Sequence, residues 1–272
     1  MRARRRFGQH FLERAWVDKL VEVIAPQAVD QMLEIGPGRG ALTLALAPLV
    51  STLIAVEIDR DLVARLRPRL PPHARVVEGN FLRLQRSAFL PADSAHDKLR
   101  VVGNLPYAIS SPILFRLLSL ARDVGGLSDA TLMLQREVAE RLAAGPGSRT
   151  YGVLSIHTRM DADAALLMQL PPGAFRPRPE VWSGVVRLVF RPPAVPLISR
   201  AEFDGVVRSL FAQRRKTTAN ALKSLARARG LDARQVLDEA GVDGSRRPET
   251  LDLPELARVA DVLASATEPS VV

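Results

Sequence analysis

The segment VVGNLPYAISSPI, residues 101–113, ends an apolar run with residue types that can do chemistry: Asn104, Leu105, Pro106 and Tyr107. Pro106 fixes its own φ and disfavours helix at the residue before it, so the loop is stiff. A stiff loop can point carbonyl groups outward. We expect the Asn104 side-chain carbonyl and the Leu105 backbone carbonyl to accept hydrogen bonds from one exocyclic amino group. Tyr107 is then expected to stack on the flat ring that carries this amine.

This arrangement suits methylation of an amine on a nucleobase. The amino nitrogen of adenine is conjugated and weakly nucleophilic, and two acceptors on its hydrogens push its lone pair out of the ring plane. Positioning and electrostatics then do most of the catalysis. No strong base is needed, because the proton becomes acidic once the nitrogen has gained its methyl group. Asn and Pro are also common in ordinary strand-to-helix turns, so this interpretation depends on what surrounds the loop.

A glycine-rich turn, EIGPGRG at residues 34–40, follows an apolar strand and precedes a helical pattern. Gly36 and Gly38 allow a tight turn and a close approach of the backbone to a ligand. Glu57 ends the next predicted strand, where a carboxylate can accept from both ribose hydroxyls of a nucleoside. The spacing is GxGxG, without the third glycine that opens a helix for a pyrophosphate. We therefore predict a cofactor that carries a nucleoside, although such turns also occur without ligands.

Two further residues end the third predicted strand at the same edge of the sheet, Asn80 and Phe81. The amide of Asn80 can hydrogen-bond an adenine edge, and Phe81 can cover the face of that ring. A place in the hydrophobic core is an equally good interpretation of Phe81.

The elements that must position these residues alternate between strands and helices, which predicts a doubly wound, mostly parallel α/β sheet. The seven predicted strands are residues 31–35, 52–58, 74–79, 100–104, 130–135, 164–170 and 184–190. The helical patterns that alternate with them cover residues 41–50, 61–70, 111–123 and 137–145. Residues 14–26 add an amphipathic helix before the first strand. Only a Pro-rich segment joins the last two strands, which we expect to pair antiparallel at one edge.

A proline-rich boundary at residues 191–196 separates this block from a region with helical patterns only. We predict a domain of residues 1–193, with a basic arm over residues 1–14, and a small all-α domain of residues 194–272. The predicted helices of the second domain are residues 201–213, 217–230, 233–241 and 254–265.

Composition excludes several classes of protein and favours a polyanionic partner. The chain has 272 residues, no cysteine and a net charge of +9. Disulfides and thiol chemistry are therefore excluded, and we expect a cytoplasmic protein. No apolar run is long enough for a membrane span and no secretory signal follows the basic start, although a transit peptide fits it. The basic residues gather near both ends, and we expect RNA contacts from Arg4, Arg5, Arg6, Arg214, Arg215, Lys216 and Lys223. A solvated helix face is the alternative for the second group. The four histidines have no metal-ligand spacing, so we expect no metal.

The motifs EIGPGRG, VEID, GNLPY, RFGQHFL, PPGAFRPRPEVWS and FAQRRKTTANAL together resemble those of the bacterial small-subunit ribosomal RNA adenine dimethyltransferases, over essentially the whole chain. The resemblance implies a class I methyltransferase fold and S-adenosylmethionine as methyl donor. It also implies dimethylation of two adjacent adenines near the 3′ end of that RNA, within an immature small ribosomal subunit. We expect a monomer.

The resemblance also assigns roles to matching residues. It implies that His10 and Leu12 line the donor pocket and that Gly36 lies at the methionine end of the donor. Asn104 joins the donor pocket to the target amine, and Phe175 stacks on the second face of the flipped base. The family commonly has aspartate where this chain has Asn80, which predicts weaker binding of the donor.

Four alternatives stay open at this point. The large-subunit methylases that confer macrolide resistance share the Asn-Leu-Pro-Tyr type of loop. A ribosome-assembly or RNA-binding factor needs no methylation for its role. A nicotinamide-dependent dehydrogenase predicts GxGxxG and leaves residues 104–107 unexplained. A protein-glutamine methylase is expected to carry a second proline in place of Leu105.

Overall fold

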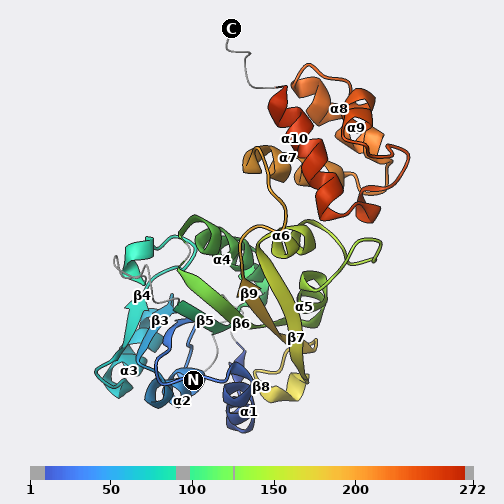
Figure 1. Cartoon of the computed structure of the whole chain (residues 1–272). Helices are drawn as coiled ribbons and strands as arrows, with labels where there is room; N and C mark the ends of the chain where they lie inside the picture. Colours follow the sequence, from blue (N-terminus) through green and yellow to red (C-terminus); the bar gives the residue numbers. More distant parts are fainter. Residues whose placement is uncertain (1–9, 90–98, 125, 267–272) are drawn as a thin grey trace. The chain divides into compact units, whose positions relative to one another are not determined.

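The chain folds into two compact units. A computed structural model describes residues 10–89, 99–124 and 126–266 (Figure 1). The first unit combines Met1–Glu140 with Ala162–Arg191, and the second combines Arg141–Asp161 with Pro192–Val272.

A seven-stranded sheet forms the centre of the first unit, in the order β4-β3-β2-β5-β6-β9-β7. Strands β4, β3, β2, β5 and β6 run parallel to one another, whereas β9 pairs antiparallel with both β6 and β7. The bounds are β2 Gln31–Ile35, β3 Thr52–Glu57, β4 Ala74–Glu78, β5 Leu99–Asn104, β6 Leu127–Gln135, β7 Ala162–Leu170 and β9 Ser183–Phe190. The predicted mostly parallel sheet with an antiparallel edge is confirmed, and β9 is inserted between β6 and β7.

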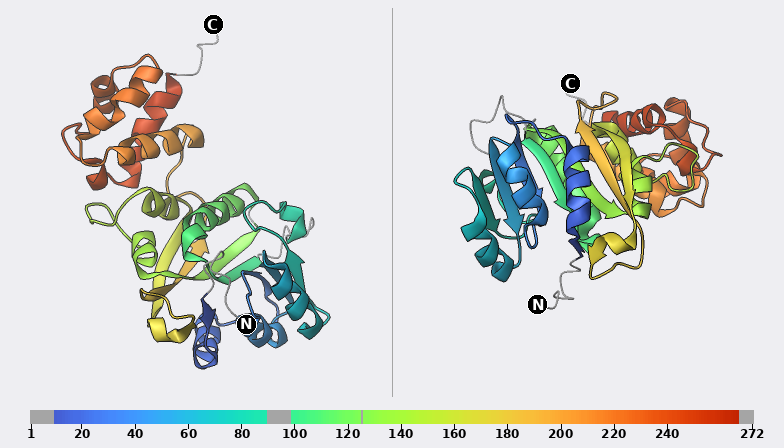
Figure 2. Two further views of the ribbon diagram at one scale, coloured as in Figure 1. Left: turned by 180° about the vertical axis from the view of Figure 1, so that it is seen from behind. Right: turned by 90° about the horizontal axis from the view of Figure 1, so that it is seen from below.

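The order of the strands reverses beside β2. From β2 the chain moves outward through β3 and β4, and it then returns to β5 and β6 on the other side. Because such crossovers are right-handed, α2 (Ala41–Leu46) and α3 (Arg60–Leu66) lie on one face of the sheet. Helix α4 (Ser110–Val124) lies on the other face (Figure 2). A reversal of this kind leaves a crevice at the carboxyl ends of the two strands beside it, which are β2 and β5.

Burial on both faces explains why the central strands are apolar throughout rather than alternating. In β3, the residues Leu53, Ile54, Ala55 and Val56 are each at most 3% exposed. Helix α1 (Arg14–Ile24) instead buries one stripe, which consists of Val17, Leu20 and Ile24.

A small sheet that the sequence analysis did not predict connects the N-terminal segment to the Pro-rich segment. Strand β1 (Phe11–Leu12) pairs antiparallel with β8 (Phe175–Arg176), so that Leu12 lies opposite Phe175. The side chains of Arg176 and Glu13 form an ion pair at 3.1 Å. This pairing fixes the start of the described chain near the carboxyl ends of the main strands.

The second unit is helical, and its extent corrects the predicted domain boundary. Residues 141–161, which we assigned to the first domain, pack with the C-terminal helices. They include α6 (Val153–Asp161), which the sequence analysis missed. The physical reason is a shared core, since Tyr151, Ile156 and Met160 are fully buried in one cluster with Phe203. The predicted C-terminal helices are present as α7 Arg200–Ala212, α8 Thr218–Ala228, α9 Ala233–Glu239 and α10 Leu253–Ser265.

Side-chain caps explain where three of these helices begin. Ser199 accepts the Glu202 N–H at the start of α7, and Asp232 accepts two backbone N–H groups at the start of α9. Helix α10 begins with a reciprocal capping box between Asp252 and Glu255. Within the residues that the structure describes, no helix combines the length and the apolar character that crossing a bilayer requires.

Candidate active site

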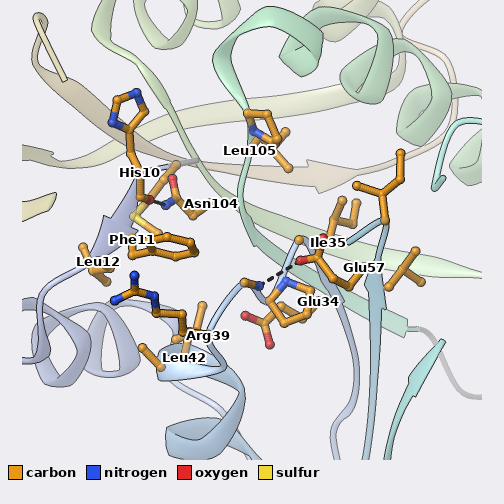
Figure 3. Close-up of a pocket in the computed structure, with 18 of the residues that line it drawn as sticks. His10, Phe11, Leu12, Glu34, Ile35, Arg39, Leu42, Glu57, Asn104 and Leu105 are labelled. Carbon is orange, nitrogen blue, oxygen red and sulfur yellow. Dashed lines mark hydrogen bonds between the residues drawn. The ribbon is translucent and has the colours of Figure 1, made fainter. Parts of the chain in front are cut away.

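A cavity of about 310 Å³ opens at the carboxyl ends of β2, β3 and β5 (Figure 3). Its position matches the crevice expected where the strand order reverses. The predicted cofactor and loop residues come together in its lining, which includes His10, Leu12, Gly36, Gly38, Glu57, Asn80, Phe81, Asn104, Leu105, Pro106 and Tyr107.

The turn after β2 requires glycine at two positions along the cavity. Gly36 and Gly38 have φ values of +73° and +59°, a region that side chains disfavour. A Cβ atom on Gly38 would lie 3.0 Å from the Phe11 ring. The Gly36 N–H donates to the carbonyl of Val56 at 2.9 Å, which ties the turn to β3. A ligand can therefore approach the backbone of this turn closely.

Glu57 is a buried carboxylate held in place by backbone donors. Its Oε2 accepts the Gly38 N–H at 3.0 Å and its Oε1 accepts the Asp59 N–H at 2.9 Å. Burial raises the pKa of Glu57, and the backbone N–H groups of Asp59, Gly38 and Ile58 oppose that rise. A carboxylate has about four acceptor positions, so Glu57 can still accept a hydrogen bond from a ligand.

Glu34 is a lining residue that the sequence analysis did not single out. It is 2% exposed, and its Oε2 atom has no hydrogen-bond partner among the described residues. Burial raises the pKa of Glu34 to about 7; the Thr43 hydroxyl opposes this rise, and the charge of Glu57 adds to it. The signal in the sequence was an acidic residue between two apolar residues near the end of β2.

Asn80 and Phe81 belong to a tightly held segment after β4. The Asn80 Oδ1 atom accepts the Leu82 N–H at 3.0 Å, so the amide oxygen already has one donor. Phe81 is 5% exposed and contacts the Phe89 ring, with a centroid distance of 5.4 Å. Arg116 donates to the Leu82 carbonyl at 2.9 Å and lies over the Phe81 ring. Phe81 thus fits both predicted interpretations, since it lines the cavity and is part of the core.

The Asn104 amide has a defined orientation. Its Nδ2 atom donates to the His10 carbonyl at 2.7 Å, which identifies Oδ1 as the acceptor end, with no partner for it among the described residues (Figure 3). The Leu105 N–H donates to the Met133 carbonyl at 3.2 Å and so extends the β5–β6 pairing into the loop. Pro106 has φ −58° and ψ 126°, which agrees with the stiff loop predicted from its ring.

Tyr107 is held at both ends of its side chain. Its hydroxyl shares a hydrogen bond of 2.7 Å with Ser183 Oγ, at the start of β9. Its ring stacks with the His10 imidazole at a centroid distance of 5.3 Å and an interplanar angle of 26°. Burial raises the pKa of Tyr107, opposed by the bond to Ser183. His10 Nδ1 lies 2.8 Å from the Pro177 carbonyl, which fixes the imidazole in turn.

Phe175, which is predicted to stack on a flipped base, lies in the hydrophobic core in this structure. The Phe175 side chain has no exposed surface and belongs to the same core cluster as Leu170 and Val185. Side chains alternate along a strand, so Phe175 in β8 turns to the core while the next residue, Arg176, lines the cavity. The ring that faces Tyr107 in this structure is His10.

The basic residues predicted to bind RNA differ in exposure and in ion pairing. Arg4, Arg5 and Arg6 lie outside the described residues. Arg214 donates to Glu249 at 3.1 Å and to the Arg149 carbonyl at 3.2 Å, so its charge is partly used within the second unit. The remaining three are exposed, namely Arg215, Lys216 and Lys223. No group of three or more potential metal ligands occurs in the part of the chain that the structure describes.

Comparisons of the sequence with known proteins identify a family of RNA methylases. The family model described as ribosomal RNA adenine dimethylase matches residues 1–258. A protein of Nitrosococcus oceani named ribosomal RNA small subunit methyltransferase A is 47% identical over 261 residues, or 93% of each chain. A protein of the same name from Xanthomonas axonopodis pv. citri is 43% identical over 264 residues, or 96% of each chain.

Two solved structures share the fold. A dimethyladenosine transferase from Plasmodium falciparum has a TM-score of 0.76 and 24% identity, and the match covers 92% of this chain and 96% of that one. The 23S rRNA methyltransferase ErmE has a TM-score of 0.63 and 25% identity, over 93% of this chain and 99% of that one. The mostly parallel seven-stranded sheet is that of the class I methyltransferases, and the chain belongs to the ribosomal RNA adenine dimethylase family.

Proposed function

We propose that this chain is an S-adenosylmethionine-dependent enzyme that dimethylates the exocyclic amino groups of two adjacent adenines near the 3′ end of small-subunit ribosomal RNA. The observation that carries the proposal is the orientation of the Asn104 amide. Because Nδ2 donates to the His10 carbonyl at 2.7 Å, Oδ1 remains to accept from a target amine at the cavity.

The residues present fit an S-adenosyl donor. When bound, the donor supplies a methyl group on a positively charged sulfur. Gly36 leaves space for the methionine end, since a Cβ on Gly36 would meet nothing closer than the Asn104 backbone carbonyl at 3.9 Å, and glycine at position 38 avoids a clash with Phe11. Glu57 offers acceptor positions for the two ribose hydroxyls. Phe81 provides an apolar face for the adenine, and His10 and Leu12 line the same cavity.

The resemblance places Asn80 where the family commonly has aspartate. Its oxygen accepts the Leu82 N–H, and its Nδ2 group is a donor that a carboxylate lacks. A neutral amide oxygen accepts more weakly than a carboxylate. We therefore expect Asn80 to bind the adenine end of the donor more weakly than aspartate would, without loss of activity.

The target amine is activated by position rather than by a base. Oδ1 of Asn104 and the carbonyl of Leu105 accept its two hydrogens, which turns the nitrogen lone pair toward the donor. Tyr107 offers its ring to the flipped base and is kept in place by Ser183. Once the nitrogen has gained a methyl group it is positively charged and releases one proton to water. One hydrogen then remains, and one of the two acceptors suffices to hold the amine for the second transfer.

The His10 imidazole occupies one face of the Tyr107 ring, on which a base would otherwise stack. The two ring centroids are 5.3 Å apart, which is too close for a base to lie between them, because each stacked contact needs about 3.5 Å. The base therefore either displaces the imidazole or uses the other face of Tyr107. Extruding the base costs a few kcal/mol, and stacking returns roughly 1–3 kcal/mol per contact.

The RNA is expected to be held by cations of the second unit and of the N-terminal arm. Arg215, Lys216 and Lys223 are exposed and suit phosphate contacts, which make affinity fall steeply with salt. The substrate we propose is an immature small ribosomal subunit, and we expect the enzyme to act as a monomer in the cytoplasm.

Methyl transfer from a labelled donor tests the proposal. Immature small subunits, large subunits and protein-free ribosomal RNA are each offered as substrate, and the labelled positions are mapped. We expect label on two adjacent adenines near the 3′ end of the small-subunit RNA. Label confined to the large subunit would instead assign the resistance-methylase activity. A normal cellular role for an Asn104→Ala variant would make methylation secondary to ribosome assembly.

A further inference from the structure

An exposed tryptophan lies directly beside the catalytic loop. Trp182 is 44% exposed and its neighbour Val181 is 42% exposed. Exposed large apolar side chains that adjoin each other on a soluble protein often mark a contact surface. The site described above does not use either residue, and neither lines the cavity.

The sheet register fixes the position of Trp182 relative to the site. Because β9 is antiparallel to β6, with Ser183 opposite Gln135, its first residues lie at the edge where Asn104 pairs with Met133. The Trp182 carbonyl accepts the Arg136 N–H at 2.9 Å, which continues this pairing by one residue.

Ser183 connects Trp182 directly to Tyr107, the residue on which we expect the target base to stack. Its hydroxyl bonds the Tyr107 hydroxyl at 2.7 Å, and Trp182 is the preceding residue in the chain. If a base is flipped onto Tyr107, the nucleotides on either side of it continue along the rim of the cavity. Consecutive Cα atoms are about 3.8 Å apart, so the backbone of Trp182 is within the reach of one of these nucleotides.

The charges around Trp182 are of both signs. Arg178 is exposed and Arg136 is half-exposed, and Glu180 and Glu140 lie in the same two segments. With little net charge, attraction to phosphate is weak here and the indole ring is the dominant feature. Stacking on an aromatic ring tolerates any base, because every base has a π face.

We propose that Trp182 stacks on an unpaired nucleotide that flanks the target adenine and so helps to hold the RNA strand while the base is in the pocket. This inference rests on the proposed RNA substrate and goes beyond it by naming the contact. Trp182 acts as a positioning residue, because it touches the RNA but not the reacting atoms.

Intrinsic fluorescence tests the contact, because the chain contains two tryptophans. A Trp16→Phe variant makes Trp182 the sole source of indole emission. Titration with protein-free small-subunit ribosomal RNA is expected to quench this emission in a saturable way. Unchanged emission under conditions in which the RNA is retained with the protein on a filter overturns the inference.

Kinetics give an independent test on immature small subunits. Trp182→Ala is expected to raise the KM for the particles about 5- to 150-fold, with kcat and donor affinity little changed. Trp182→Phe, which keeps a ring, restores most of the loss. Val189→Ala is the matched control, since Val189 is 47% exposed and lies near the far end of β9, the strand that Trp182 immediately precedes.

The outcomes separate this inference from the proposed function. Wild-type protein without methyl transfer to small-subunit RNA refutes the proposed function, even if Trp182 emission is quenched. Normal transfer by wild type together with an unchanged KM for Trp182→Ala refutes the inference alone. Loss of donor affinity in Trp182→Ala would also contradict it, because the effect would then be structural.

Discussion

Replacing Asn104 by alanine or by aspartate separates the two roles of its side chain, which are to donate a hydrogen bond to His10 and to accept one from the target amine. In the native side chain, Nδ2 donates to the His10 carbonyl at 2.7 Å, while Oδ1 is left for the target amine. Asn104→Ala removes both ends of the amide. Asn104→Asp keeps an acceptor oxygen for the amine but places a second oxygen against the His10 carbonyl.

The expected losses follow from these contacts. Removal of one fixed polar group from a transition-state site costs roughly 100- to 1000-fold in rate, which we expect for kcat of Asn104→Ala. In Asn104→Asp, the unpaired His10 carbonyl costs about 1–3 kcal/mol. That corresponds to about a 5- to 150-fold smaller fraction of molecules in the active arrangement. The kcat of Asn104→Asp should therefore lie between those of Asn104→Ala and wild type.

Single-turnover methyl transfer at saturating donor measures these effects, and calorimetry on the same proteins measures donor affinity separately. Thermal unfolding of each variant provides the control for folding. An Asn104→Ala protein within about threefold of wild type would refute the role of Oδ1 as acceptor. An Asn104→Asp protein as fast as wild type would refute the idea that the bond to His10 orients the amide.

Three further predictions concern the donor site, the buried carboxyl and the basic surface. Gly38→Ala should weaken donor binding about 5- to 30-fold in calorimetry, because its left-handed φ costs about 1–2 kcal/mol and the added methyl meets an aromatic ring; Gly173→Ala, with open space around it, should have no such effect. Burial raises the pKa of Glu34 from 4.5 to about 7, so its stabilising contribution is present below about pH 4.5 and is lost as pH rises through 7. Between about pH 5 and 8, the free energy of unfolding of wild type should therefore fall by up to roughly 3 kcal/mol relative to Glu34→Gln in urea titrations, and parallel curves would contradict the raised pKa. Joint replacement of Arg215 and Lys216 by alanine should reduce the slope of log affinity against log salt by about 2, and an unchanged slope would exclude them as phosphate contacts.

The main sheet was predictable because its strands are apolar, short and separated by helical patterns. The position of β9 between β6 and β7 was not, since periodicity gives the strands but not the order in which they pair. The two-residue strands β1 and β8 have no sequence pattern of their own. Helix α6 was missed because Ser155, His157 and Thr158 are buried polar residues and interrupt the apolar stripe that marks a surface helix.

Residues at the ends of strands were predictable as site residues because parallel strands bring their carboxyl ends to one edge. The fate of each side chain depends on tertiary contacts that the sequence does not show. Phe175 pairs opposite Leu12 in β8 and turns into the core, and Arg214 is partly neutralised by Glu249. Glu34 was overlooked because its burial and its unpaired oxygen become visible only in three dimensions.

A crystal structure of the chain with S-adenosylhomocysteine and an adenosine-containing RNA tests the central claim most directly. We expect the N6 atom of the flipped adenine to lie about 2.8–3.2 Å from both Asn104 Oδ1 and the Leu105 carbonyl oxygen. The sulfur of S-adenosylhomocysteine should lie in the cavity next to Gly36, facing the N6 atom in the direction in which its lone pair points. An adenine bound elsewhere, or an Asn104 amide turned so that Nδ2 faces the target, would contradict it.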